Sequence, residues 1–131
     1  MEDKQIKAEK LIEKMTKERG YIYDEWKFAA TNDPDFVEAY NNLYSSGLNA
    51  GEALSLVDRE LVACGILCFR NLTNGVKTHM IRAIKHGATK QQLLEAIETC
   101  IVPGGAPTFF TGLEALMLTL KECEEKGIEV K

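Results

Sequence analysis

The residues best suited to chemistry in this sequence are a carboxylate, two thiols and an imidazole. Glu60 and Cys64 lie four residues apart, so they share one ridge of a predicted helix, with Cys68 beside it. His79 follows a short turn at residues 72–74, which predicts that its helix folds back against that ridge. We therefore expect these four side chains to share one pocket.

Each member of this set has a chemical and a structural interpretation. A buried Glu60 and a histidine that titrates near neutrality could pass protons, and a thiol beside them could become a reactive thiolate. The histidine could instead be a hydrogen-bonded core residue, and the cysteines small hydrophobic residues. The glutamate could simply favour the dipole of its helix. The residues alone leave both interpretations open.

Two further kinds of site are not predicted. In an intact helix the β-carbons of Cys64 and Cys68 are about 6 Å apart, whereas a disulfide needs about 4 Å. His79 and His86 are separated by about 10 Å along one helix, which is too far to share a metal ion. We therefore expect free thiols and no metal site.

The spacing of hydrophobic residues also predicts helices N-terminal to the residues of this pocket. An N-terminal helix ends at Gly20, and its apolar face consists of Ala8, Leu11, Ile12 and Met15. Asp33 and Pro34 are start signals for another helix, whose expected apolar face consists of Phe36, Tyr40, Leu43 and Tyr44. Residues 21–30 show no clear period, although we expect their aromatic side chains to be buried: Tyr21, Tyr23, Trp26 and Phe28.

Helix caps mark the elements that carry the pocket. Residues 55–58 and 89–92 each fit a capping box. Thr73 or Asn74 is expected to cap the helix of His79. No window alternates like a half-buried strand, and prolines interrupt the chain at residues 103–107. The pattern predicts an all-α fold of about six or seven helices with a central antiparallel helix pair.

Length and composition indicate one soluble domain. The 131 residues are 45% hydrophobic and 27% charged, with a net charge of −4, and no basic stripe indicates a nucleic-acid partner. We expect a single domain over residues 1–131, with a peripheral helix within residues 1–20 and a core over about 33–120. The charged N-terminus lacks an apolar signal segment, and no apolar stretch is long enough to span a membrane. We therefore expect a cytoplasmic protein.

Four short motifs carry a family resemblance. They are Leu54-Ser55-x-x-x-Arg59-Glu60-Leu61, His79-x-x-x-Ala83-x-x-x-Gly87-Ala88-Thr89, Leu94-Glu95, and Gly104-Gly105-Ala106-Pro107. In this order and spacing they resemble the carboxymuconolactone decarboxylase family, which also includes the alkylhydroperoxidase AhpD. The resemblance covers most of the chain. It implies an AhpD-like helical bundle that assembles as a trimer or hexamer, with sites near the subunit contacts.

The two branches of that family imply different chemistry. The AhpD branch places a CxxC motif between the glutamate and the histidine. Glu60 and His79 match its spacing, but the cysteine positions fall on Leu72 and Gly75. The usual disulfide-forming peroxidase mechanism therefore lacks both of its thiols. The decarboxylase branch needs no CxxC, and its reaction removes carbon dioxide from a carboxylated muconolactone without a cofactor.

The decarboxylase branch implies roles for particular residues. His79 would be the proton donor or oxyanion partner, and Glu60 would orient it or shuttle the proton. Arg59 and Arg82 are candidate contacts for an anionic substrate. Such an enzyme would take a small molecule as substrate and copies of itself as partners.

Two other functions stay open on the sequence. One is an antioxidant enzyme of the alkylhydroperoxidase or peroxiredoxin type, in which Cys64 or Cys68 replaces the missing pair through an accessible thiol of low pKa. The other is a non-catalytic oligomeric binding protein, in which Glu60 and His79 only satisfy each other. We favour the decarboxylase-like enzyme over both.

Overall fold

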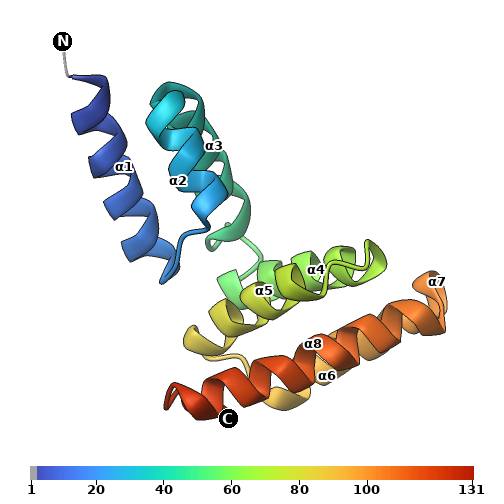
Figure 1. The fold of residues 1–131 in the computed structure, drawn as a ribbon. Coiled ribbons are helices and arrows are strands. Elements are labelled where there is room, and N and C mark those ends of the chain that lie inside the picture. The colour runs from blue at the N-terminus through green and yellow to red at the C-terminus, as the bar shows by residue number, and fades with distance from the viewer. Residues whose placement is uncertain (1–2) are drawn as a thin grey trace. The chain divides into compact units, whose positions relative to one another are not determined.

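The computed structural model describes residues 3–131, and this part of the chain is all α-helical, as predicted (Figure 1). Eight helices form within it instead of the expected six or seven, and they are α1 Lys4–Arg19, α2 Asp24–Asn32, α3 Pro34–Leu48, α4 Leu56–Phe69, α5 Thr73–Lys85, α6 Lys90–Thr99, α7 Ile101–Gly104 and α8 Ala106–Glu125. Helix α2 forms in residues whose hydrophobic period was unclear. Helix α7 is a single turn between α6 and α8, in the region where a break was expected.

The chain divides into two compact units, and the second begins at Leu48. In the first unit, α1 ends as predicted at Gly20, which adopts a left-handed conformation with φ 78°. The first unit has its own apolar cluster, which consists of Leu11, Met15, Ala30 and Val37. The helix expected to be peripheral thus supplies two of the four buried side chains of that cluster.

The apolar face predicted for α3 is wrong at two of its four residues, whereas Tyr40 and Tyr44 are half-buried. Asp33 does cap this helix, since its Oδ1 accepts a hydrogen bond from the Phe36 amide at 3.2 Å. Phe36 and Leu43 are nevertheless exposed, whereas Val37 and Asn41 are buried. The buried face is rotated because Val37 packs into the cluster of the first unit. The expected burial of Tyr23 and Phe28 is wrong as well, since both are exposed.

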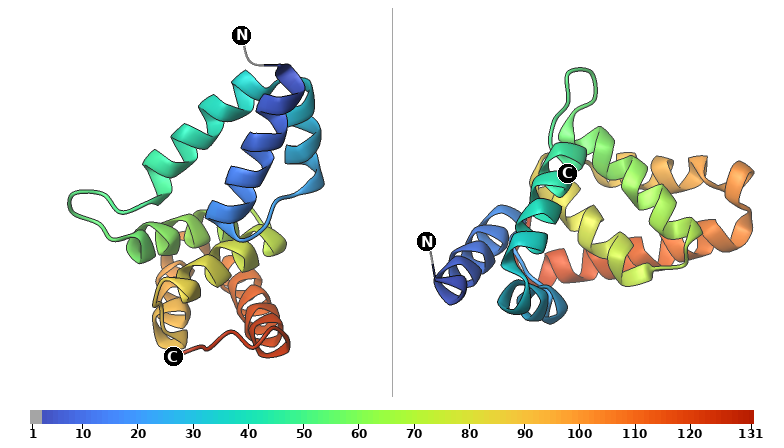
Figure 2. Two further views of the ribbon diagram at one scale, coloured as in Figure 1. Left: turned by 90° about the vertical axis from the view of Figure 1, so that its left-hand side faces the viewer. Right: turned by 90° about the horizontal axis from the view of Figure 1, so that it is seen from above.

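The second unit, Leu48–Lys131, is built on the central pair α4 and α5, with α6 and α8 on one side of the pair (Figures 1 and 2). A three-residue turn joins α4 to α5, and its middle residue, Asn71, has a φ of 57°. Neither Thr73 nor Asn74 caps α5, contrary to expectation, because the N-cap position falls on Leu72, whose side chain makes no capping hydrogen bond. The backbone closes this turn instead, through a bond from the Leu72 amide to the Leu67 carbonyl at 3.0 Å.

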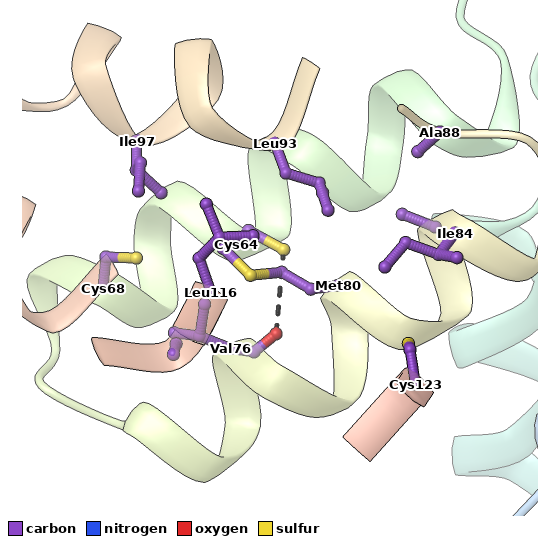
Figure 3. Packing of buried hydrophobic residues seen from close by; sticks show 12 residues of the cluster. Cys64, Cys68, Val76, Met80, Ile84, Ala88, Leu93, Ile97, Leu116 and Cys123 are labelled. Atoms are coloured by element: carbon purple, nitrogen blue, oxygen red, sulfur yellow. Dashed lines mark hydrogen bonds between the residues drawn. The ribbon is translucent and has the colours of Figure 1, made fainter. Parts of the chain in front are cut away.

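The other predicted caps of the second unit are confirmed. Ser55 and Asp58 exchange side-chain to backbone hydrogen bonds of 3.0 and 3.1 Å at the start of α4. Thr89 and Gln92 do the same at the start of α6. These caps set where α4 and α6 begin. Cys64 and Cys68 of α4 and Leu93 and Ile97 of α6 belong to the apolar core of the second unit, together with Met80 (Figure 3).

Candidate functional site

The antiparallel packing of α4 and α5 brings Glu60 and His79 into contact. Glu60 lies in α4 with an exposed fraction of 0%, and its Oε2 is 2.6 Å from Nδ1 of His79 in α5. The imidazole is only partly covered, with 17% of its side chain exposed. The sequence therefore predicted correctly that the short turn would bring these two residues together.

Arg82 completes a buried charged cluster with these residues. It lies one turn after His79 in α5, and its Nη1 donates to the second Glu60 oxygen, Oε1, at 2.5 Å. Its Nη2 donates to Oδ1 of Asn49 at 2.7 Å, and Nη1 also lies 3.4 Å from the Leu48 carbonyl. Both carboxylate oxygens of Glu60 are thus engaged, as a buried charge requires.

The two arginines proposed as anion contacts both hold the segment that precedes α4. Arg82 is buried and binds Asn49 through the Asn49 side chain. Arg59 Nη1 donates to the backbone carbonyl of Asn49 at 3.1 Å. Its guanidinium also lies against Gly51, where an added β-carbon would come within 2.8 Å of Nη2. Their contact with a substrate anion stays a prediction. No motif or spacing in the sequence indicated a role for Asn49.

The two cysteines of α4 are buried in the core, not exposed in a pocket (Figure 3). Burial raises the pKa of Cys68 to about 11. Burial also raises the pKa of Cys64, and the charge of Glu60 raises it further. The Cys64 thiol lies 4.0 Å from the Val76 carbonyl, so it packs between α4 and α5. These are properties of core thiols and differ from the accessible, easily ionised thiol that the antioxidant hypothesis expects.

The positions of the missing CxxC lie at the start of α5, before His79. Leu72 is exposed at the N-cap position, and Gly75 lies in the first turn, where an added β-carbon would be 3.6 Å from Leu67.

Over residues 3–131, no group of three or more histidine, cysteine, aspartate or glutamate side chains could hold a metal ion. Within the same residues, no helix is long and apolar enough to cross a membrane.

An apolar groove of about 640 Å³, here called the α4 groove, lies between α4 and the helices α6, α7 and α8. It is lined by Leu61, Val62, Gly65, Ile66, Phe69, Ala96, Thr99, Cys100, Pro103, Gly104 and Thr108. Val62 and Ile66, one turn apart on its α4 wall, are each 58% exposed. This groove was not predicted from the sequence, although the nearly unbroken apolar run of α4 was a signal that more than one face of the helix is apolar.

Comparison with known proteins identifies a family and a similar fold. Residues 34–117 match the model of the Carboxymuconolactone decarboxylase family. The fold is similar to that of a Burkholderia xenovorans LB400 protein provisionally named a carboxymuconolactone decarboxylase, with a TM-score of 0.80 at 19% identity, covering 95% of this chain and 97% of the other. None of the curated proteins matches this sequence.

Proposed function

This chain belongs to the carboxymuconolactone decarboxylase family, and from that premise we propose that it is an enzyme of proton transfer and decarboxylation. Its substrate would be a small carboxylated lactone or a related acid, and the reaction would need no cofactor. The observation that carries the proposal is the 2.6 Å contact between a fully buried Glu60 carboxylate and a partly exposed His79 ring.

His79 is the residue that would meet the substrate. Glu60 engages Nδ1, so Nε2 is the ring nitrogen that would act on a reacting group. In the proposed reaction the bond from the ring carbon to the carboxylate breaks, carbon dioxide leaves, and the electron pair remains as a dienolate. A proton from His79 Nε2 then adds to carbon, as expected of a positioned general acid.

Glu60 would orient the ring and stabilise its protonated form. A carboxylate beside an imidazole fixes which ring nitrogen carries the proton and stabilises the imidazolium. The anion of the substrate would need a positive partner, for which Arg59 remains our candidate because it is only partly buried. Arg82 is a weaker candidate because its guanidinium already binds Glu60 and Asn49.

The experiment is a screen of carboxylated lactones and β-keto acids for release of carbon dioxide, with His79→Gln as the test variant. We expect His79→Gln to fold and to lose activity by a factor of about 10² to 10⁴, the usual contribution of a general acid. The matched control is His86→Gln, since His86 is the second histidine, is exposed and follows the end of the same helix. A folded His79→Gln protein with full activity would refute the proposal, and a wild type inert on every substrate would favour a binding protein.

We also propose that the protein works as a trimer or hexamer in the cytoplasm. The α4 groove supports self-association, because three large apolar side chains on its α4 wall are each more than half exposed to solvent, and burying them against another protein surface would be favourable. Val62, Ile66 and Phe69 are spaced at i, i+4 and i+7, the spacing with which one helix face packs against another helix. The occupant that we propose is a second copy of this chain.

A further inference from the structure

Residues 49–55, which lead from α3 to α4, are held against the site by two guanidinium groups. Arg82 Nη2 donates to Oδ1 of Asn49 at 2.7 Å, and Arg59 Nη1 donates to the Asn49 backbone carbonyl at 3.1 Å. The Gly51 amide donates to the Leu54 carbonyl at 2.9 Å, which closes a turn just after this anchor. An exposed loop residue, Asn49, is thus bound through its side chain to a buried arginine.

Hydrogen bonds connect Asn49 to His79 through two intermediate side chains, Arg82 and Glu60. The guanidinium group of Arg82 is planar and rigid, so its two terminal nitrogens cannot move independently. One of them binds Asn49 at 2.7 Å, and the other binds Glu60 at 2.5 Å. The second oxygen of the same carboxylate holds the imidazole of His79 at 2.6 Å. The Asn49 side chain therefore helps to set the direction in which Glu60 faces His79.

The charges of Arg82 and Glu60 in this hydrogen-bonded series suit a neighbouring imidazole that must change its protonation state. Arg82 is always charged, so the carboxylate of Glu60 keeps a positive partner whether His79 carries one proton or two. When the imidazole gives up a proton, no unmatched charge is left in the buried site, which would be costly. Asn49 orients Arg82 without adding a charge of its own, because its acceptor is a neutral amide oxygen.

We propose that Asn49 is a positioning residue for His79, acting through Arg82 and Glu60. Its role is to hold the guanidinium in place so that the carboxylate keeps its 2.6 Å contact with Nδ1. This inference rests on the proposed function, in which His79 is the proton donor. It adds a residue that neither the motifs nor the spacing of the sequence indicated.

The test follows the Nδ1–H proton of His79 by NMR on full-length protein labelled with ¹⁵N in its histidines. In the wild type this proton donates to Glu60, and we expect it to be protected from exchange with water. In Asn49→Ala we expect its exchange to be faster by about tenfold, which corresponds to about 1.4 kcal/mol and is close to the lower end of what a hydrogen bond to a charged group contributes. In Asn49→Asp, which keeps an acceptor at the same place, the protection should return.

Three comparisons make this result specific. Asn42→Ala removes an exposed asparagine from α3 and should change nothing. The Nδ1–H of His86, which donates to the Arg82 carbonyl at 2.9 Å, reports in the same spectrum whether α5 is intact. Should Asn49→Ala lose its fold, Asn49→Ser shortens the side chain while keeping it polar and gives the same comparison.

The inference and the proposed function can fail separately. Unchanged exchange at His79 in a folded Asn49→Ala protein would overturn the role of Asn49, as would an equal acceleration in Asn42→Ala. The measurement needs no substrate, so it stands whatever the substrate screen gives. Once a substrate is known, Asn49→Ala should lower kcat by about tenfold with little change in KM, because Asn49 orients the proton donor and does not touch the substrate.

Discussion

Glu60 shows at the residue scale how this site combines stability with chemistry. A carboxylate without exposed surface is costly unless its oxygens are paired and hydrogen-bonded. Both of its oxygens are engaged, one by Arg82 at 2.5 Å and the other by His79 at 2.6 Å. Because Arg82 matches the charge, His79 is not needed merely to neutralise the carboxylate. The ring can therefore exchange protons while the core stays paired.

The thiol of Cys68 gives a prediction for the pH dependence of stability. Its pKa is raised by burial from 9.0 to about 11 in the folded protein. The folded state therefore keeps a proton that the unfolded chain loses above pH 9.0, so this contribution to stability is complete below that value and falls as the pH rises through about 11. We expect the free energy of unfolding in urea to fall more steeply with pH above 9.0 in the wild type than in Cys68→Ala.

The comparison between the two proteins is essential here, because lysines and tyrosines also titrate at high pH. Cys68→Ala removes one titrating group, so the difference between the two curves isolates the thiol. If the two curves run parallel between pH 9.0 and 11, the thiol is not buried in the way described. Rapid oxidation of the native protein at Cys64 or Cys68 by hydrogen peroxide would contradict the burial directly and return the antioxidant hypothesis to consideration.

At the scale of the helices, the close packing of α6 against α8 depends on Gly112. A β-carbon added there would lie 2.7 Å from Cγ2 of Ile97 and 3.3 Å from the sulfur of Cys68. It would also lie 2.8 Å from Cβ of Ile97, which a rotamer change cannot move, so the two helices would have to shift apart. We expect Gly112→Ala to lower the free energy of unfolding by about 1–3 kcal/mol, the usual cost of overpacking a core.

The control for this prediction is Gly47→Ala. Gly47 also lies in a helix, α3, but a β-carbon added there would meet nothing within 4 Å. Alanine is the better helix former, so this variant should be neutral or more stable by up to about 1 kcal/mol. Urea unfolding of both variants separates the two effects. Equal stabilisation in both would mean that Ile97 relaxes without cost and that the packing is looser than described.

The helices also show which parts of the fold the sequence could predict. The capping boxes at Ser55 and Thr89 were predictable because their hydrogen bonds join residues three apart. The buried face of α3 was not, because Val37 and Phe36 are adjacent and only the packing of the first unit decides which one is covered. A regular hydrophobic pattern limits the choice of face but does not settle it when apolar residues lie at adjacent positions, as Phe36 and Val37 do.

One part of the candidate site could likewise be predicted from the sequence, and another part could not. The contact between Glu60 and His79 followed from the spacing of the two residues about a short turn. The contact between Arg82 and Asn49 joins residues 33 apart in the sequence, through a loop with no periodic pattern. Side-chain contacts of that kind depend on the path of the loop, which composition and spacing do not determine. The sequence therefore indicated the reactive pair but not the residues that orient it.

The whole molecule combines two apolar clusters with a large exposed apolar surface. One cluster lies in each unit, and the family match over residues 34–117 begins in α3 and covers most of the second unit. The α4 groove remains open in the single chain, and Phe69 at its edge is exposed. Val62, Ile66 and Phe69 lie on one face of α4 and are each more than half exposed, so covering them would remove apolar surface from water. This face of the second unit is therefore where we expect the copies to meet.

Self-association can be tested by changing one residue of the α4 groove. We expect the wild type to sediment at three or six times the mass of the single chain. Ile66→Glu should weaken the assembly by at least about tenfold in dissociation constant, because each contact would bury an unpaired carboxylate. Ile66 is more than half exposed in the single chain, so the substitution should leave its fold intact. The measurement is sedimentation equilibrium over a range of protein concentrations.

The matched control is Ile6→Glu, which makes the same substitution at an exposed isoleucine of α1 that lies outside the groove. It should assemble like the wild type. A wild type that stays monomeric at the highest concentration would refute the proposed assembly, and an Ile66→Glu protein that assembles normally would place the contact on another surface. If Ile66→Glu becomes monomeric yet keeps its activity, then the groove serves assembly and the chemistry around His79 is complete within one chain.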